Sequence, residues 1–305
     1  MIRVAVIGFG KIAADQHLPS IAADPHFELV GVATRSSDPR IGVPWFEDAG
    51  ELIAAMRGEA DAVAICTPPG ARHAIALEAL RAGYDVLLEK PPATTLGEID
   101  ELDRVAQAEG RVLFTAWHSQ YAAAVAPAAA ALAGAEVEML HISWREDVRK
   151  WHPGQEWIWE AGGFGVFDPG INALSIATRI LPMPLLVRGA TLWVPENRQA
   201  PIAAAIEFVG SRLSAEFDWR FEQGEEWIIR IATRDGRRIE LLDGGARMTI
   251  NGVGQPLGDH GEYRSIYDRF AELVASRMSA IDREPLRIAA DAFVIARRES
   301  VAAFR

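Results

Sequence analysis

The 305-residue sequence has a single cysteine, Cys66, so it can form neither an intrachain disulfide nor a cysteine-based metal cluster. It also lacks an excess of positive charge, because 31 Lys and Arg stand against 42 Asp and Glu, a net charge of −11. This balance argues against non-specific binding to nucleic acids or anionic membranes. No apolar run reaches the length of a membrane span, and the first ten residues, MIRVAVIGFG, lack the features of a signal peptide. We therefore expect a cytoplasmic protein that binds neither nucleic acid nor membrane.

The first 120 residues alternate between strand and helix patterns. Residues 3–9 form a continuous apolar run that ends in a glycine turn, which is typical of a strand buried on both faces. Repeated strand–helix units of this length predict an α/β fold with a parallel, doubly wound sheet, so residues 1–120 are expected to form a dinucleotide-binding (Rossmann) domain. The expected strands are 3–9, 27–34, 61–67, 84–90 and 111–117, and the clearest helices are 11–23, 71–83 and 96–110.

Beyond residue 120 the pattern changes to strands in close succession. Turn sequences at 209–211 and 235–236 separate several of them, which predicts antiparallel hairpins. Residues 121–305 are therefore expected to form an α+β domain with a large, mostly antiparallel sheet, for substrate binding and oligomerisation. The expected strands are 137–146, 185–194, 203–209, 212–220, 227–236 and 237–244, and the expected helices are 170–181, 262–278 and 287–303.

Apolar residues in two of these strands bear on the oligomeric state. Residues 185–194 and 203–209 carry enough apolar side chains that full exposure of their sheet face would be unfavourable. A second copy of the chain would cover this face. We therefore expect a homo-oligomer, specifically a dimer.

The segment GFGKIA, residues 8–13, matches the pattern G-x-G-x-x-G/A that binds the pyrophosphate of a dinucleotide. It follows the first strand and precedes the first helix, which is the context that the pattern requires. Gly8 permits the tight turn, Gly10 lets the backbone approach the pyrophosphate, and the start of the helix attracts negative charge. We therefore predict a nicotinamide dinucleotide bound by Gly8, Phe9, Gly10, Lys11 and Ile12.

The end of the second strand bears on which nicotinamide cofactor is used. Sites selective for NAD usually carry an acidic residue there, which bonds the ribose hydroxyls. This chain instead has Thr34, Arg35 and Ser36. An arginine can stack on adenine and pair with a 2′-phosphate, and a serine can donate a hydrogen bond to that phosphate. The sequence therefore predicts NADP as the preferred cofactor, with NAD also accepted.

Residues 144–172 combine four of the nine tryptophans with acidic, amide and imidazole side chains. The C–H faces of a sugar ring stack on indoles, while its hydroxyls need directional hydrogen bonds. The tryptophans are interleaved with charged residues and Gly/Pro breaks, and they follow no helix or strand period. This composition favours a neutral, polyhydroxylated ligand. The tryptophans are Trp144, Trp151, Trp157 and Trp159, and the polar members are Glu146, His152, Asp168 and Asn172.

The chain resembles the glucose–fructose oxidoreductase / inositol dehydrogenase (Gfo/Idh/MocA) family over essentially its whole length. The motifs that carry the resemblance are VIGFGKIA (6–13), CTPP (66–69), EKPP (89–92) and FDPGIN (167–172). Within the family it is most similar to aldose 1-dehydrogenases that oxidise L-arabinose and D-galactose, through segments 11–21, 116–119, 144–160 and 165–176. Both sugars share their configuration from C1 to C4 as pyranoses, so a site that recognises the shared hydroxyls accepts both. The resemblance implies NAD(P)-dependent oxidation of an aldopyranose at C1 to the aldonolactone.

The resemblance also implies the catalytic residues. Family members carry a lysine in the E-K-P turn, and an aspartate usually followed four residues later by a histidine on a helix of the second domain. This chain has Lys90 and Asp168, but Asn172 replaces the histidine and cannot exchange a proton near neutral pH. Asn172 would then bond the C1 or C2 hydroxyl. Either Asp168 or a neutral Lys90 could be the general base. A lysine ammonium lowers the pKa of a neighbouring carboxylate, which makes that carboxylate a weaker base.

Further residues are expected around the two ligands. No metal site is predicted, because the sequence has one cysteine and no H-x-x-x-H pattern or helix with paired carboxylates. The residues expected to bind the sugar are His118, Glu146, Trp151, His152 and Trp227. Beyond those already named, the residues expected to line the cofactor are Cys66, Thr67, Pro68, His73, Glu89, Lys90, Trp117 and His118.

Two alternative functions stay open. The first is a regulator that binds a sugar without turnover on the same scaffold. Lys90 and Asp168 argue against it, because a sensor needs no lysine poised against an acid. The second is a dehydrogenase of the same family that acts on another polyol, against which Asn172 and the tryptophan-rich segment weigh by resemblance only.

Overall fold

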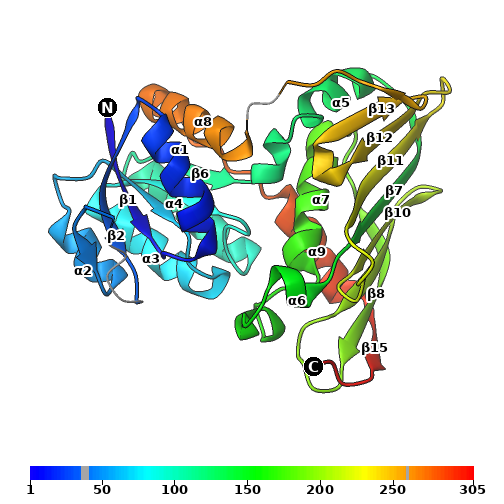
Figure 1. Ribbon diagram of the computed structural model, residues 1–305, viewed down its shortest axis with the longest axis horizontal. Coiled ribbons are helices and arrows are strands. Elements are labelled where there is room, and N and C mark those ends of the chain that lie inside the picture. The colour runs from blue at the N-terminus through cyan, green and yellow to red at the C-terminus, as the bar shows by residue number, and fades with distance from the viewer. Residues whose placement is uncertain (36–40, 259–260) are drawn as a thin grey trace. The chain divides into compact units, whose positions relative to one another are not determined.

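A computed structural model describes residues 1–35, 41–258 and 261–305, and the chain divides into two compact units (Figure 1). The first unit comprises Met1–His118 and Tyr263–Arg283, and the second comprises Ser119–Glu262 and Glu284–Arg305.

Among its described residues, the first unit contains a six-stranded parallel sheet in the order β3-β2-β1-β4-β5-β6. This order confirms the doubly wound sheet of a Rossmann domain. The chain runs from β1 outwards to β3 and then returns to β4 on the other side of β1, so the carboxyl ends of β1 and β4 lie where ligands bind in such sheets. The strands are β1 (Ile2–Ile7), β2 (Phe27–Ala33), β3 (Trp45–Phe46), β4 (Ala62–Ile65), β5 (Asp85–Glu89) and β6 (Leu113–Ala116), and the helices are η1 (Ala13–His17), α1 (Leu18–Ala23), α2 (Ala49–Ala55), α3 (Pro69–Ala82) and α4 (Leu96–Ala108).

The first unit is not one continuous stretch of chain, because it includes nearly all of helix α8 (Glu262–Ser276). The expected domains, 1–120 and 121–305, placed this helix in the second domain. Its aromatic side chains pack on the parallel sheet. Tyr267 lies edge-on to Phe27 at a ring-centroid distance of 5.1 Å, and Phe270 stacks on Phe27 and Phe114 at 6.1 and 6.2 Å. The amphipathic pattern predicted this helix but not its partner, because periodicity shows which face is apolar and not what that face covers.

In the second unit, nine strands among the described residues form one sheet in the order β14-β13-β12-β11-β7-β10-β9-β8-β15. Neighbouring strands are antiparallel except for the pairs β7–β10 and β8–β15, which confirms the mostly antiparallel sheet. Helices α7 and α9 lie on one face of it (Figure 1). The strands are β7 (Val137–Arg145), β8 (Val187–Pro195), β9 (Ala203–Phe208), β10 (Leu213–Asp218), β11 (Glu226–Thr233), β12 (Arg238–Leu242), β13 (Arg247–Ile250), β14 (Val253–Gly254) and β15 (Arg297–Val301). The helices are η2 (His118–Tyr121, at the boundary between the units), α5 (Val125–Leu132), α6 (Val148–Trp151), η3 (Glu156–Trp159), α7 (Phe167–Ile180), η4 (Asp243–Gly245) and α9 (Glu284–Ile295).

The expected helix over residues 287–303 is wrong in its second half. Helix α9 ends at Ile295, and Arg297–Val301 forms β15, which pairs in parallel with Thr191–Pro195 of β8. Pairing along the otherwise open edge of β8 satisfies backbone groups of both strands, and this tertiary interaction outweighs the local helix propensity of the segment.

The burial of β8 and β9 changes the basis for the expected dimer. Leu192, Ile206 and Phe208 are fully buried, and α9 of the same unit packs on β8, so these side chains need no second subunit to cover them. Val187, Trp193 and Val194 of β8 are only half-buried, and the dimer stays a prediction. Within the described part of the chain, no helix combines the length and apolar character that crossing a bilayer demands.

Candidate active site

The glycine turn lies at the carboxyl end of β1, where the strand order reverses. Gly8 has a φ of +94°, and a Cβ built on it would come within 2.8 Å of the backbone nitrogen of Thr67. A larger residue is therefore excluded at this position. At Gly10, no heavy atom of the described residues beyond its chain neighbours lies within 4 Å of such a Cβ. The backbone of Gly10 is thus open to a ligand, as the dinucleotide pattern requires.

The segment that follows β4 faces the same turn and fits a dinucleotide. The hydroxyl of Thr67 is buried, and it has no hydrogen-bond partner among the residues that the structure describes. A buried hydroxyl without a partner is unfavourable, so an oxygen of a bound phosphate or ribose would satisfy it. Cys66 precedes it and is half-buried, and Pro68 caps the start of α3. The residues present therefore fit the cofactor that the sequence predicts.

The end of β2 holds part of the predicted site for the adenosine ribose. Thr34 is buried and its amide donates to the carbonyl of Phe46, whereas Arg35 is exposed. Ser36 lies outside the described residues. In the glycine turn itself, exposed Lys11 pairs with Asp15.

The lysine turn follows β5 and is held from its buried side. The amide of Lys90 donates to Oε2 of Glu89 at 2.9 Å, and the peptide bond between Lys90 and Pro91 is cis. Arg72 of α3 donates to the carbonyl of Glu89 at 2.7 Å and also to the carbonyl of Pro91. Buried side chains therefore hold the backbone on both sides of Lys90.

Two of the predicted cofactor residues have other neighbours in the structure. Trp117 is buried, and its indole nitrogen donates to the carbonyl of Asp282 at 2.9 Å. The ring of His73 bonds Glu101 of α4 at 2.9 Å. In both cases the side chain is held by a residue distant in sequence, which no local motif marks. His118, by contrast, stacks on Tyr263 with ring centroids 5.6 Å apart.

The second unit brings four of the predicted residues together. Nε2 of His152 lies 3.8 Å from Oε1 of Glu146 and 3.7 Å from Oδ2 of Asp168. The indole nitrogen of Trp227 donates to Oε2 of Glu146 at 2.9 Å. Asn172 lies one turn after Asp168 on α7, so the two side chains share a helix face. The cluster combines carboxylate acceptors with imidazole and indole donors.

The tryptophans of residues 144–159 have different roles. Trp144 and Trp159 are buried, whereas Trp151 is 40% exposed with its ring centroid 5.3 Å from that of Trp227. Trp151 is therefore the most exposed of the four tryptophans, and the ammonium of Lys150 lies over its ring, 5.1 Å from the centroid. Trp219, which the sequence reasoning missed, packs against His152 at 5.3 Å. Its indole nitrogen is buried without a hydrogen-bond partner among the described residues.

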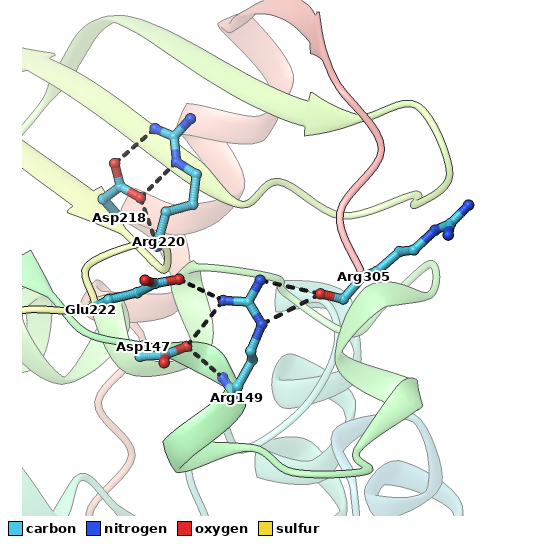
Figure 2. A network of polar contacts seen from close by, with 6 residues as sticks. All are labelled: Asp147, Arg149, Asp218, Arg220, Glu222 and Arg305. Atoms are coloured by element: carbon cyan, nitrogen blue, oxygen red, sulfur yellow. Dashed lines mark hydrogen bonds and ion pairs between the residues drawn. The ribbon is translucent and has the colours of Figure 1, made fainter.

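A network of polar contacts holds the loop that carries Trp151 and His152 (Figure 2). Asp147 caps α6 by accepting from the amide of Arg149 at 2.9 Å. The guanidinium of Arg149 donates to Glu222 at 3.1 Å and to the carbonyl of Arg305 at 3.2 Å. The loop is thereby tied to two segments that are distant in sequence.

We expect Arg149→Met to loosen this loop. The KM for the sugar should rise by about two- to fivefold, the range expected for an exposed ion-pair network, with kcat nearly unchanged. Steady-state kinetics measure both constants. Arg220→Met is the matched control, because the guanidinium of Arg220 lies nearby and pairs with Asp218 (Figure 2). Arg220 meets Asp147 only through its backbone, which the substitution leaves in place. Equal KM values in the two variants would contradict this role for Arg149.

The glycine turn, the lysine turn and the parallel sheet that positions them define an oxidoreductase with a dinucleotide-binding Rossmann unit. In agreement, residues 2–117 match the model of an oxidoreductase family with an NAD-binding Rossmann fold. The chain is 46% identical to galactose 1-dehydrogenase of Pseudomonas fluorescens, over 99% of this chain and 98% of that one. The chain therefore belongs to the Gfo/Idh/MocA oxidoreductase family.

Solved structures agree with this assignment. The crystal structure of D-galactose-1-dehydrogenase from Rhizobium etli matches with a TM-score of 0.93 and 47% identity, over 100% of this chain and 98% of that one. A 3-ketoreductase from Actinomadura kijaniata, crystallised with NADP and TDP-benzene, shares the fold with a TM-score of 0.85 and 21% identity, over 98% and 99% of the two chains.

Proposed function

We propose that this protein oxidises an aldopyranose at C1 to the aldonolactone with NADP or NAD, and that L-arabinose, D-galactose or both are its preferred substrates. The observation that carries the proposal is the cluster of Glu146, His152, Asp168 and Trp227 beside the exposed ring of Trp151. Such a cluster supplies hydrogen-bond partners for hydroxyls and an aromatic face for a sugar ring. The similarity to galactose 1-dehydrogenases supports the same substrate class.

The reaction removes a hydride from C1 and a proton from the C1 hydroxyl. A bound NAD(P)⁺ supplies the chemistry of hydride acceptance at the nicotinamide. Asp168 is proposed to accept the proton, and Lys90 to orient the C1 oxygen and stabilise the negative charge that develops on it. Asn172 holds the C1 or C2 hydroxyl. A neutral Lys90 acting as the base is the alternative assignment.

The remaining hydroxyls are assigned to further predicted site residues. Glu146 and His152 are proposed to bond sugar hydroxyls, and Trp151 and Trp227 to contact the ring faces. His118 is proposed to contact the sugar or the nicotinamide. NADP is proposed as the preferred cofactor because exposed Arg35, without an acidic neighbour among the described residues at the end of β2, suits a 2′-phosphate. We further propose a dimer that works in the cytoplasm.

The test is nicotinamide reduction by the purified protein, with NADP⁺ and NAD⁺ each assayed against a panel of aldoses. We expect fast reduction with D-galactose and L-arabinose and little with D-glucose and D-xylose, their respective C4 epimers. Equal rates within each epimer pair would contradict recognition of the C4 hydroxyl. Absence of reduction, with NADP⁺ still bound, would favour the sugar-sensing regulator or a different polyol.

A further inference from the structure

A buried polar network lies directly behind the lysine turn in the first unit. Oε1 of Glu89 accepts from Tyr263 Oη at 2.6 Å and lies 3.0 Å from Nε2 of His17. The other ring nitrogen of His17, Nδ1, lies 2.8 Å from the hydroxyl of Tyr267. His17 and Glu89 are 0% and 2% exposed. The network therefore joins η1, β5 and α8, three elements that are far apart in the sequence.

Electrostatics favours an ion pair within this network. Burial alone raises the pKa of Glu89, but the hydrogen bond and charge of His17, with the charges of His118 and Arg72, hold the pKa well below its usual value. Burial likewise lowers the pKa of His17, yet the hydrogen bonds of the ring with Cys66 and Glu89 oppose this, and the pKa stands well above its usual value. Both directions favour a carboxylate on Glu89 and a proton on His17. A buried pair of this kind needs all its hydrogen bonds, because removing one partner exposes the other to the full cost of burial.

The two oxygens of Glu89 link this network to Lys90. Oε1 faces His17 and Tyr263, while Oε2 accepts from the amide of Lys90 at 2.9 Å. The orientation of the carboxylate, and with it the position of the Lys90 backbone, therefore depends on the partners of Oε1. The ring of Tyr263 also stacks on His118, so one residue contacts both the carboxylate and a second predicted site residue.

We propose that His17, Tyr263 and Tyr267 are positioning residues that hold Lys90 in its working orientation through the carboxylate of Glu89. This inference rests on the role proposed for Lys90. The three residues need not touch the substrate or the cofactor. They act on the placement of the lysine, and misplacement of a catalytic group by a fraction of an ångström already lowers the rate.

The first experiment removes single hydroxyls. Tyr263→Phe should lower kcat by about tenfold and Tyr267→Phe by a smaller factor, while the Kd for NADP⁺ stays unchanged. Tyr84→Phe is the matched control, because the hydroxyl of Tyr84 is also buried in the first unit but donates to the carbonyl of Ile53. Its kcat should equal that of the unmodified protein. A Tyr263→Phe variant that keeps full kcat would overturn the proposal.

A double-mutant cycle separates positioning from simple loss of stability. If Tyr263 acts through Glu89, Tyr263→Phe should have almost no further effect on kcat in a Glu89→Gln background. Tyr84→Phe should have the same effect in both backgrounds. Additive effects of Tyr263→Phe and Glu89→Gln on kcat would contradict a role through Glu89.

A second measurement does not depend on sugar oxidation. The chain has only three lysines, Lys11, Lys90 and Lys150. An NMR spectrum of the protein labelled with ¹³C at lysine Cε is therefore simple, and the signal that disappears in Lys90→Met belongs to Lys90. Tyr263→Phe should move the Lys90 signal and leave the signals of Lys11 and Lys150 in place. If the Lys90 signal is the same in Tyr263→Phe and in the unmodified protein, the positioning proposal is overturned, whether or not any aldose is oxidised. If the Lys90 signal moves as expected but the unmodified protein oxidises no aldose, only the proposed function is overturned.

Several charged or titratable groups face the pair of His17 and Glu89. Burial raises the pKa of Tyr267 to about 12, so its hydroxyl stays neutral under the conditions of an activity assay. The groups that face the pair are Cys66 after β4, Arg72 of α3, His118 of η2, and Tyr263 and Tyr267 of α8.

Discussion

Lys90→Met is expected to lower kcat by about a thousandfold, the scale of losing an electrostatic stabiliser or general base at the reacting oxygen. Methionine keeps most of the length of the side chain but removes its charge and donors. The Kd for NADP⁺ should stay nearly unchanged, because Gly8, Gly10 and Thr67 offer the backbone and hydroxyl contacts for the dinucleotide independently of this ammonium. Single-turnover kinetics and fluorescence titration with the cofactor measure the two constants. Near-normal turnover would remove Lys90 from the mechanism.

Lys90→Arg separates the two roles that remain open for this lysine. Arginine keeps the positive charge but is not deprotonated in proteins, so it can stabilise negative charge and cannot act as a base. If Lys90 orients the C1 oxygen, the arginine variant should recover part of the rate lost in Lys90→Met. If Lys90 is the base, both variants should be equally slow.

Asp168→Asn is expected to lower kcat by a factor of about a hundred to ten thousand, the contribution of a general base. Asp168 is 5% exposed, and Oδ2 lies 3.7 Å from Nε2 of His152, so the carboxylate has a defined place in the second unit. Asparagine has the same shape and keeps α7 intact but cannot accept the proton.

Glu146→Gln is the comparison for Asp168→Asn, because Glu146 is 3% exposed and also lies near His152 but is assigned to binding. Its loss should raise the KM for the sugar more than it lowers kcat. Equal losses of kcat in the two variants would contradict the division between a catalytic and a binding carboxylate. Unchanged kcat in Asp168→Asn would transfer the role of base to Lys90.

The candidate site was predictable where a local pattern carries the chemistry. The steric requirement at Gly8 and the exposed backbone at Gly10 follow from a six-residue pattern. The neighbours of Glu89 were not predictable, because His17 and Tyr263 reach it from segments 72 and 174 positions away and no motif connects them. The composition of residues 144–172 did not show which tryptophans are exposed, because buried Trp144 stands in the same segment as exposed Trp151.

Local information determined the order of strands and helices, the two-part organisation and the glycine turn, because side-chain periodicity and backbone sterics act between residues close in the chain. Tertiary contacts alone decided that α8 covers the parallel sheet and that Arg297–Val301 is a strand. They also decided that the carboxylate of Glu89 meets the buried ring of His17 at 3.0 Å. These features depend on which distant segments meet, and burial then sets the charge and the hydrogen-bond partners that each side chain must have.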